Sequence, residues 1–440
     1  MQIISEANQN VLKILRRFRK QGPCTRRLHY CVEEQTEDGI LLFNLLTREL
    51  ILLAEEEHQN LLTDEYLQEH WFVVPEESKD KEYVEVVRWV LSSRKKTKAI
   101  TNYTIFTTTD CNARCFYCFE LGRSRVPMDH EIALKTVRYI KEHCRGEKVR
   151  LSWFGGEPLL NYEAIDTICD GLRKEGVEFS STMITNGYLF DTELVKKAVT
   201  DWRLKKVQIT LDGTEEVYNR IKAFVHQEGS AYRRVMDNMR HLLDASIKIS
   251  IRLNMDMHNA ENLLELVDEL GCAFDGRDGL SVYAYHIFED GKPMAEIHTE
   301  EGWNLRHEAM SRLKERIEAR GLSVVQGIRK KPKNNRCMAD SGRSVTILPT
   351  GDIGLCEHHS ENEFIGHLDR EEVNEEVIAI WRETVPEIPE CETCFYYPDC
   401  IRLKKCSNDR VCFHHLRMDY LESTKRAMRN EYKKWIEQTK

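Results

Sequence analysis

The sequence predicts an α/β fold in three parts, with an open, partial (β/α)6 barrel of the TIM type at its centre. Between residues 101 and 321, six short apolar runs alternate with six segments of helical periodicity. A strand-rich region precedes this part, and a cysteine-rich, loop-rich tail follows it. A chain of 440 residues is too long for one ordinary core, so several domains suit its length.

The barrel prediction depends on the order of strands and helices. The expected strands are Tyr103–Thr108, Val149–Phe154, Glu178–Ile184, Lys206–Leu211, Lys248–Leu253 and Leu280–Ile287. The expected helices are His130–His143, Ala164–Glu175, Thr192–Val199, Tyr232–Leu243, Ala260–Leu270 and Trp303–Arg320. Short connections between them imply parallel strands with right-handed crossovers. Barrels of this kind carry their chemistry at the carboxyl ends of the strands.

The flanking parts follow other patterns. The first, residues 1–95, reads as a small winged-helix-like domain of strands and helices. Its expected strands are His29–Glu34, Ile40–Leu46, on either side of the Asp38-Gly39 turn, and Leu50–Leu53; its helices lie near Asp64–Gln68 and Tyr83–Leu91. The barrel should occupy residues 100–325. The tail, residues 330–440, should end in an amphipathic helix over Met418–Gln438.

Composition narrows the class of protein. Hydrophobic residues make up 41% of the chain, enough for sizeable cores, and a net charge of −9 argues against a nucleic-acid partner. The sequence contains no apolar run of roughly 20 residues and no apolar signal core near Met1, so we expect no membrane partner and a cytoplasmic location. Fifteen cysteines in a reducing compartment favour metal ligation over disulfides for those that cluster.

Three cysteines share one loop directly after the first barrel strand. Cys111, Cys115 and Cys118 are spaced CxxxCxxC, and we call this stretch the three-cysteine loop. Three thiolates hold three corners of a cubane iron–sulfur cluster and leave the fourth iron open to another ligand. A structural zinc site is the alternative, but it normally has four ligands with paired spacing.

With Tyr117 before its last cysteine, the loop resembles that of the radical S-adenosylmethionine (SAM) superfamily. Gly155, Gly156 and Glu157, followed by Pro158, match the family's GGEP motif after the second strand. This resemblance implies that the motif holds the SAM amino group, which suits a carboxylate beside a closely approaching glycine backbone.

Weaker matches follow later strands. The resemblance places Thr185, Asn186 and Asp212 near the SAM ribose and the floor of the site, and Arg252 and Asn254 near the SAM carboxylate or ribose. The alternative is that Asn186-Gly187 and Asp212-Gly213 are ordinary turns.

The tail carries seven further cysteines, which alone fit either zinc or iron. After a radical SAM barrel it resembles the SPASM extension, which holds two auxiliary clusters. Carried over by motif, the first set is Cys337, Cys356 and Cys406, and the second is Cys391, Cys394, Cys400 and Cys412. The resemblance thus implies three 4Fe-4S clusters, of which the first auxiliary one lacks a fourth cysteine. The family's spacing puts a cysteine where this chain has Lys404, which separates Cys406 from the pattern.

Two further features suggest the substrate. In the anaerobic sulfatase-maturing relatives, an acid matching Glu357 is proposed to take a proton from substrate, although a solvated loop charge is the alternative. His358 and His359 have two interpretations: they are solvated loop residues, or they bind the cluster on the three-cysteine loop. The run Leu42–Thr47 is similar to a strand end of PqqD-like domains, which bind leader peptides by strand addition, although a stabilising cap is the alternative.

Together these features predict a radical SAM/SPASM enzyme that modifies a ribosomally made precursor peptide with a leader. Side-chain cross-linking, such as a thioether, is the expected chemistry, with flavodoxin or ferredoxin as electron donor. The alternatives are a sulfatase-maturase-like oxidation of a Cys or Ser side chain and an inactive zinc-binding adaptor.

Overall fold

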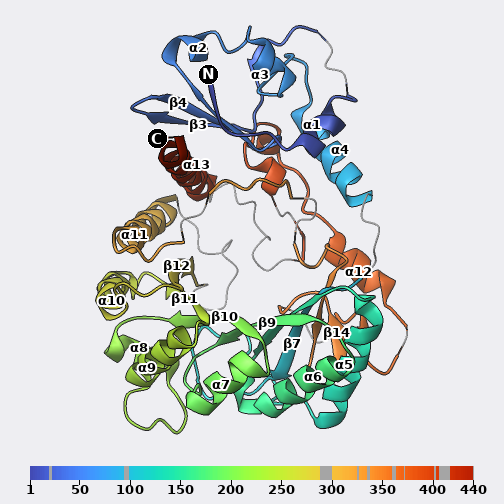
Figure 1. Cartoon of the computed structure of the whole chain (residues 1–440), viewed down its shortest axis with the longest axis vertical. Coiled ribbons are helices and arrows are strands. Elements are labelled where there is room, and N and C mark those ends of the chain that lie inside the picture. Colours follow the sequence, from blue (N-terminus) through green and yellow to red (C-terminus); the bar gives the residue numbers. More distant parts are fainter. Residues whose placement is uncertain are drawn as a thin grey trace. The chain divides into compact units, whose positions relative to one another are not determined.

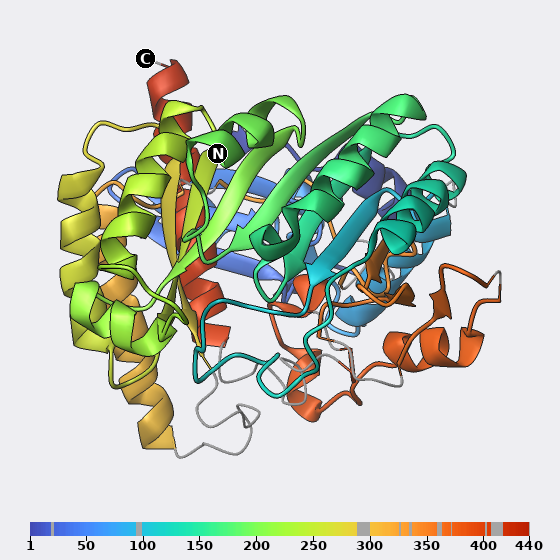
Figure 2. The same cartoon turned by 90° about the horizontal axis from the view of Figure 1, so that it is seen from below.

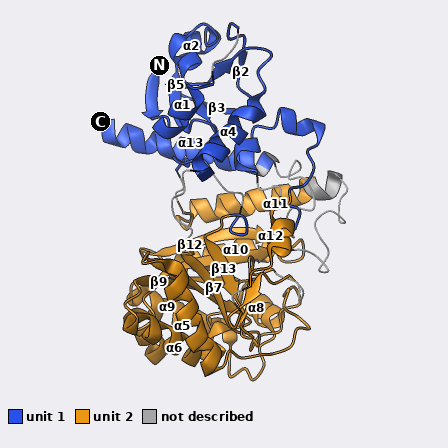
Figure 3. Ribbon diagram, turned by 90° about the vertical axis from the view of Figure 1, so that its right-hand side faces the viewer, with its two compact units in different colours: residues 1–97, 325–340, 384–440 blue, residues 98–324, 341–383 orange. Residues whose placement is uncertain are grey.

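The computed structural model describes residues 1–18, 22–93, 99–287, 300–324, 327–333, 337–358, 363–370, 372–400, 403–405 and 417–439 (Figure 1). The chain packs into two compact units (Figure 3). The first unit comprises residues 1–97, 325–340 and 384–440, and the second comprises residues 98–324 and 341–383. Each unit is therefore built from stretches far apart in the sequence.

The second unit contains a nine-stranded sheet of order β12-β11-β10-β9-β8-β7-β13-β14-β15. Its six main strands are β7 (Asn102–Thr108), β8 (Val149–Gly155), β9 (Phe179–Thr185), β10 (Leu204–Leu211), β11 (Lys248–Met255) and β12 (Leu280–His286). Each pairs in parallel with the next along the chain. All six predicted strands are present, and the α/β class with a parallel sheet is confirmed.

Helices alternate with these strands. They are α5 (His130–Cys144), α6 (Tyr162–Lys174), α7 (Thr192–Thr200), α8 (Glu215–Lys222), α9 (Ala231–Asp244), α10 (Ala260–Ala273) and α11 (Glu300–Ala319). Polar residues cap several of them: the Asp129 side chain accepts from the amide of Ile132, and Asp191 accepts from that of Leu194. Helices α5, α6, α7 and α9 lie along one face of the sheet (Figure 2), so each apolar helix face is covered by strands.

The tail contributes strands that the sequence did not lead us to expect. These are β13 (Ser344–Ile347), β14 (Asp352–Gly354) and β15 (Gly366–His367), followed by α12 (Glu375–Arg382). Strand β13 pairs in parallel with β7, with Ser344 opposite Asn102, and it is buried along its length. Part of the predicted loop-rich tail therefore extends the barrel sheet beyond β7.

The first unit is built on an antiparallel sheet of order β1-β5-β4-β3. Its strands are β1 (Gln2–Ser5), β3 (Cys31–Thr36), β4 (Gly39–Asn44) and β5 (Glu49–Leu53), with a smaller pair β2 (Arg26–Arg27) and β6 (Val73–Val74). Its helices are α1 (Gln9–Leu15), α2 (Glu55–Gln59), α3 (Glu65–Glu69), α4 (Asp80–Ser93) and α13 (Arg417–Thr439). The predicted hairpin turn is present, and Gly39 is required there because a Cβ would lie 2.3 Å from the Leu53 carbonyl oxygen.

The C-terminal helix α13 belongs to this first unit. It packs against β3 and β1, and Met428 and Tyr432 join the same apolar core as Leu41 and Phe72. The predicted tail of residues 330–440 is thus divided between the two units, with residues 341–383 in the barrel unit. No described helix is long and apolar enough to cross a bilayer.

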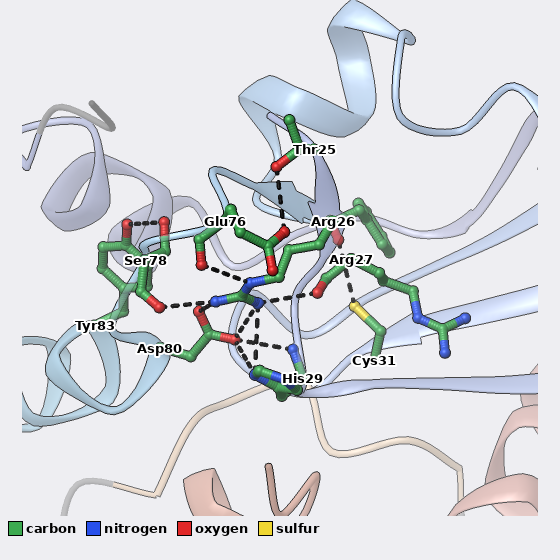
Figure 4. A network of polar contacts seen from close by, with 10 residues as sticks. Thr25, Arg26, Arg27, His29, Cys31, Glu76, Ser78, Asp80 and Tyr83 are labelled. Atoms are coloured by element: carbon green, nitrogen blue, oxygen red, sulfur yellow. Dashed lines mark hydrogen bonds and ion pairs between the residues drawn. The ribbon is translucent and has the colours of Figure 1, made fainter. Parts of the chain in front are cut away.

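A buried carboxylate joins β2 to the start of α4 in the first unit (Figure 4). Asp80 accepts hydrogen bonds from both terminal nitrogens of Arg26, at 3.0 and 2.9 Å, and from the amide of His29 at 3.0 Å. The His29 ring nitrogen Nδ1 lies 2.8 Å from the same carboxylate. Because Asp80 is almost fully buried, this network sets the path of the chain through His29 and the residue after it.

Candidate functional site

The three-cysteine loop follows β7, as the sequence predicts. Its three thiols are half-buried and free of disulfides. The Ala113 amide donates to the Cys111 sulfur at 3.3 Å, and the Cys118 amide donates to the Cys115 carbonyl at 3.1 Å. Burial raises the pKa of Cys111 to about 12, and the charges of Glu157, Cys115 and Cys118 add to this effect. The three thiols therefore lie within electrostatic reach of one another.

Within the described part of the chain, no three His, Cys, Asp or Glu side chains converge tightly enough to form a ready-made metal site. The donor chemistry of the three-cysteine loop nevertheless suits a cluster with three thiolate ligands, because it offers three neighbouring soft sulfurs on one short loop.

The glycine pair at the end of β8 crosses closely over the start of this loop. A Cβ on Gly155, whose φ is +121°, would lie 2.1 Å from the Thr108 carbonyl oxygen, and one on Gly156 would lie 2.2 Å from that of Asp110. The Gly156 amide donates to Thr108 at 3.1 Å, and the Glu157 amide donates to Asp110 at 2.8 Å. Only glycines allow this approach, which holds Glu157 beside the three-cysteine loop.

Glu157 is a fully buried carboxylate of the site. It accepts hydrogen bonds from the Thr185 hydroxyl at 2.8 Å, the Asn186 amide at 2.8 Å and the Leu159 amide at 3.2 Å. Burial raises its pKa to about 7, although the hydrogen bonds and the charge of Lys222 act in the opposite direction. The ionised form of this buried carboxyl has lost its hydrating water, and a cationic ligand would stabilise it in place of that water.

Asn186 links Glu157 to the three-cysteine loop. Its side-chain amide donates to the Asn112 side-chain oxygen at 2.7 Å and lies 3.9 Å from the Cys111 sulfur. The carboxyl ends of β7, β8 and β9 thus meet at the same edge of the sheet, as expected for adjacent parallel strands. Thr185 and Asn186, predicted as cofactor residues, are brought to Glu157 and are more than an isolated turn.

A buried ion pair contacts Tyr117 of the three-cysteine loop. Tyr117 donates to Asp212, with both carboxylate oxygens 2.9 Å from its hydroxyl, and the Lys222 ammonium lies 3.0 Å from Asp212. Lys222 also donates to the Tyr117 hydroxyl at 3.0 Å and to Thr210 at 2.8 Å. The side chains of Asp212 and Lys222 are 1% and 2% exposed. Each buried charge is therefore stabilised by the opposite charge of its partner.

Sequence reasoning missed Lys222. It is the last residue of α8, a short helix that was not predicted, and a lysine at a helix end normally reads as a solvated charge. The preceding Asp212-Gly213 turn and the tyrosine in the three-cysteine loop were the available signals.

Two predicted residues on β11 have unsatisfied polar atoms. The Nε of Arg252 and the Oδ1 of Asn254 are buried and have no hydrogen-bond partner among the described residues. The Arg252 guanidinium lies 3.8 Å from the ring centroid of Tyr285. Buried orphan atoms of this kind fit a polar ligand that carries both donors and acceptors, as SAM does.

The tail residues are only partly placed. Glu357 follows Cys356 after β14 in the barrel unit, with its Oε2 3.8 Å from the Cys356 sulfur. The His358 ring lies 4.5 Å from the ring of Phe119, and burial lowers the pKa of His358. Cys337, Cys391, Cys394 and Cys400 lie in the first unit.

His359, Cys406 and Cys412 fall outside the described residues. The tail ligand sets and a catalytic Glu357 stay predictions.

Comparison with known proteins agrees with this geometry. Residues 105–270 match the model of the Radical SAM superfamily. An uncharacterized protein of Methanocaldococcus jannaschii is 24% identical over 251 residues, which cover 57% of this chain and 82% of that protein. The GTP 3′,8-cyclase of Clostridium perfringens is 27% identical over 173 residues, and the chain spans only 50% of its length.

Two solved structures share the fold. Native anSMEcpe with bound AdoMet and Cp18Cys peptide has a TM-score of 0.56 at 16% identity, covering 77% of this chain and 98% of that one. Streptococcus suis SuiB has a TM-score of 0.52 at 14% identity, and the match covers 86% of this chain and 94% of SuiB. The matched residues, the parallel sheet and the loop after its first strand agree on one point: residues 105–270 are similar to a radical SAM domain, and this part of the chain has an α/β fold of the partial TIM-barrel type.

Proposed function

We propose that this protein is a radical SAM maturase that modifies a ribosomally made precursor peptide. The radical SAM domain implies an enzyme with a 4Fe-4S cluster and SAM. When bound, they supply a 5′-deoxyadenosyl radical, formed by one-electron reductive cleavage of SAM, that removes a hydrogen atom from substrate. The observation that carries the proposal is the buried Glu157, held beside the three-cysteine loop and linked to it through Asn186.

The chain's own residues would bind and orient the cofactor. Glu157 would accept hydrogen bonds from the SAM ammonium, and the close backbone of Gly155 and Gly156 keeps the carboxylate at that position. The orphan atoms of Arg252 and Asn254 would pair with the SAM carboxylate or ribose. Tyr117, anchored by the Asp212–Lys222 pair, would fix the last turn of the three-cysteine loop.

A peptide substrate is supported by the first unit. Strand β3 is an edge strand, paired with β4 in the described sheet, and a leader peptide would add alongside it as in PqqD-like domains. Asn44 lies at the end of β4, in the run that is similar to PqqD-like domains. Its side chain stabilises the turn that follows by accepting from the amides of Leu46 and Thr47 at 2.9 and 3.1 Å. The anSMEcpe structure, which shares the fold, contains a bound peptide.

The tail would add two auxiliary 4Fe-4S clusters, one on Cys337, Cys356 and Cys406 and one on Cys391, Cys394, Cys400 and Cys412. With three cysteines, the first auxiliary cluster would keep one iron open to a substrate thiolate, as soft sulfur suits iron. Glu357 beside Cys356 would take a proton from substrate. This arrangement favours thioether cross-linking, with electrons from flavodoxin or ferredoxin.

Co-expression of the enzyme with its precursor peptide, followed by mass spectrometry, tests the proposal. A thioether removes two hydrogen atoms and leaves a cysteine that no longer reacts with alkylating agents. A sulfatase-maturase-like oxidation of cysteine would instead replace the sulfur with an aldehyde oxygen. An unmodified peptide, together with a colourless protein that binds zinc, would refute the enzyme and support the adaptor.

Iron content separates the reactive cluster from the others. Replacing the three cysteines of the three-cysteine loop with Ala should remove roughly four iron atoms and all reductive SAM cleavage. Cys272→Ala is the matched control, because Cys272 is exposed and lies outside every proposed ligand set.

A further inference from the structure

Residues 384–400 form a segment, here called the cysteine segment, that carries Cys391, Cys394 and Cys400. It lies in the first unit, although about 300 residues of chain separate it from the sheet of that unit. Its three thiols are half-buried and free of disulfides. The donors are soft sulfurs on one short stretch, which suits an iron–sulfur ligand set.

Arg48 binds this segment from the turn between β4 and β5. Its guanidinium donates to Asp399, one residue before Cys400, from NH1 to Oδ2 at 3.0 Å and from NH2 to Oδ1 at 2.6 Å. The side chains of Arg48 and Asp399 are 1% and 13% exposed.

The backbone at Arg48 adopts a conformation that is unfavourable for a residue with a side chain. Its φ is +66°, in the left-handed region that glycine adopts without strain, and its amide donates to the Asn44 carbonyl at 2.7 Å. A glycine would make the turn without strain, yet the position holds an arginine whose charged group is fully buried.

Three more residues among the first hundred contact the cysteine segment. Arg88 donates from NH2 to the carbonyls of Tyr397 and Pro398 at 3.1 and 3.0 Å, and Tyr30 stacks on the Tyr397 ring at 6.2 Å. Tyr30 follows His29, which the Asp80 network holds in place (Figure 4). Lys81 donates to Glu387 at 2.6 Å.

These contacts act on the backbone that carries the thiols. The Tyr397 amide donates to the Cys394 carbonyl at 3.1 Å, and the Cys400 amide donates to the Tyr397 carbonyl at 3.2 Å. Arg48 and Arg88 therefore hold the turn that sets the position of Cys394 relative to Cys400.

We propose that Arg48 is a positioning residue for the second auxiliary cluster, so that the N-terminal domain is a structural part of that cluster's site as well as a peptide-binding module. This inference rests on the proposed assignment of Cys391, Cys394 and Cys400 as ligands. The N-terminal domain would then have two separable roles: its β3 edge binds peptide, and its β4–β5 turn holds the cluster ligands.

The test uses the full-length protein with the three-cysteine loop changed to Ala, so that its remaining iron belongs to the tail. Arg48→Met should lower the iron bound after anaerobic reconstitution by roughly four atoms. In the metal-free protein, it should speed amide hydrogen exchange of residues 384–400 by about tenfold or more, because the segment loses its buried anchor. Binding of the precursor peptide should not change.

Three companion variants make the result specific. Arg27→Met is the matched control, since Arg27 is an exposed arginine of the same domain that pairs with Glu33. The double variant Arg48→Met with Asp399→Leu should recover wild-type iron and exchange, because apolar replacement of both partners removes the unpaired charge. Asp399→Asn, a milder change, should give intermediate exchange, which covers the case that Arg48→Met does not fold.

Wild-type exchange in residues 384–400 of the Arg48 and Asp399 single variants would overturn the inference. So would faster exchange with full iron retained. A parent protein that binds no tail iron would instead refute the auxiliary clusters of the proposed function, and this inference would fall with them.

Discussion

The buried carboxyl of Glu157 predicts how SAM binding depends on pH. Its folded pKa, about 7, lies above the value of 4.5 that the same group has in water. The carboxyl is therefore neutral in the empty site below about pH 7 and ionised above it, and ionising it near neutral pH costs about 3 kcal/mol relative to water. An ammonium ligand requires the ionised form, so the proton must leave before SAM binds well.

The expected size follows from this pKa. Raising the pH from about 6 to about 8 should lower the dissociation constant for SAM about tenfold, because the ionised fraction of Glu157 rises by that factor. Glu157→Gln should weaken SAM binding by about 1–3 kcal/mol, the value of a charge-assisted hydrogen bond, and should remove the pH dependence. Iron content should stay unchanged, since Glu157 is not a proposed ligand.

Anaerobic isothermal titration of reconstituted enzyme with SAM measures both quantities. Glu163→Gln is the matched control, because Glu163 is an exposed glutamate on α6 close to the motif in sequence. A second measurement uses the SAM-free, metal-free protein, whose stability should fall as the pH rises from about 4.5 to about 7, since the folded form retains a proton that the unfolded chain releases. A SAM dissociation constant that is flat across this range, or equally steep in Glu157→Gln, would refute the reasoning.

Three other outcomes follow from the structure. Lys222→Met should lower the melting temperature of the barrel unit far more than Lys174→Met, an exposed lysine, because it leaves Asp212 buried without its cationic partner at a cost of about 3–5 kcal/mol; equal shifts in scanning calorimetry would contradict this. Replacing the three-cysteine loop with Ala should abolish 5′-deoxyadenosine formation, and chromatography that still detects it would end the radical SAM interpretation. Deleting residues 1–92 should stop modification of full-length precursor and, because Arg48 and Arg88 are lost with them, lower the tail iron as well, while uncoupled SAM cleavage continues; mass spectrometry of the peptide, iron analysis and chromatography of the nucleoside together decide this.

The barrel could be predicted closely because its pattern is local. Apolar runs bounded by turns and helices with one apolar face follow from nearest neighbours in the sequence, so the predicted bounds of β7 and α5 agree with the structure to within one residue. Candidate site residues followed from the same logic, since residues after parallel strands meet at one edge. Thr185 and Asn186 reach Glu157 for this reason, and Asp212 reaches Tyr117.

What could not be predicted depends on contacts between distant residues. Strands β13, β14 and β15 have only two to four residues each, too few to show a period, and β13 becomes a strand because β7 offers it a partner. The buried pair of Arg48 and Asp399 joins residues 351 positions apart, and both read as ordinary surface charges in the sequence. The division of the tail between two units follows from such contacts.

Both units contain residues from the C-terminal part of the chain, and this has a consequence for biosynthesis. Helix α13 supplies Met428 and Tyr432 to the core of the first unit, and β13 pairs with β7, whose own residues were made more than 230 positions earlier. A ribosome adds roughly 5–20 residues each second, so the nascent N-terminal domain and the β7 edge wait many seconds for partners that emerge last. A chain that stops before Ser344 lacks the partners of both units and should therefore aggregate through both, whereas a chain that loses only α13 should expose the core of the first unit alone.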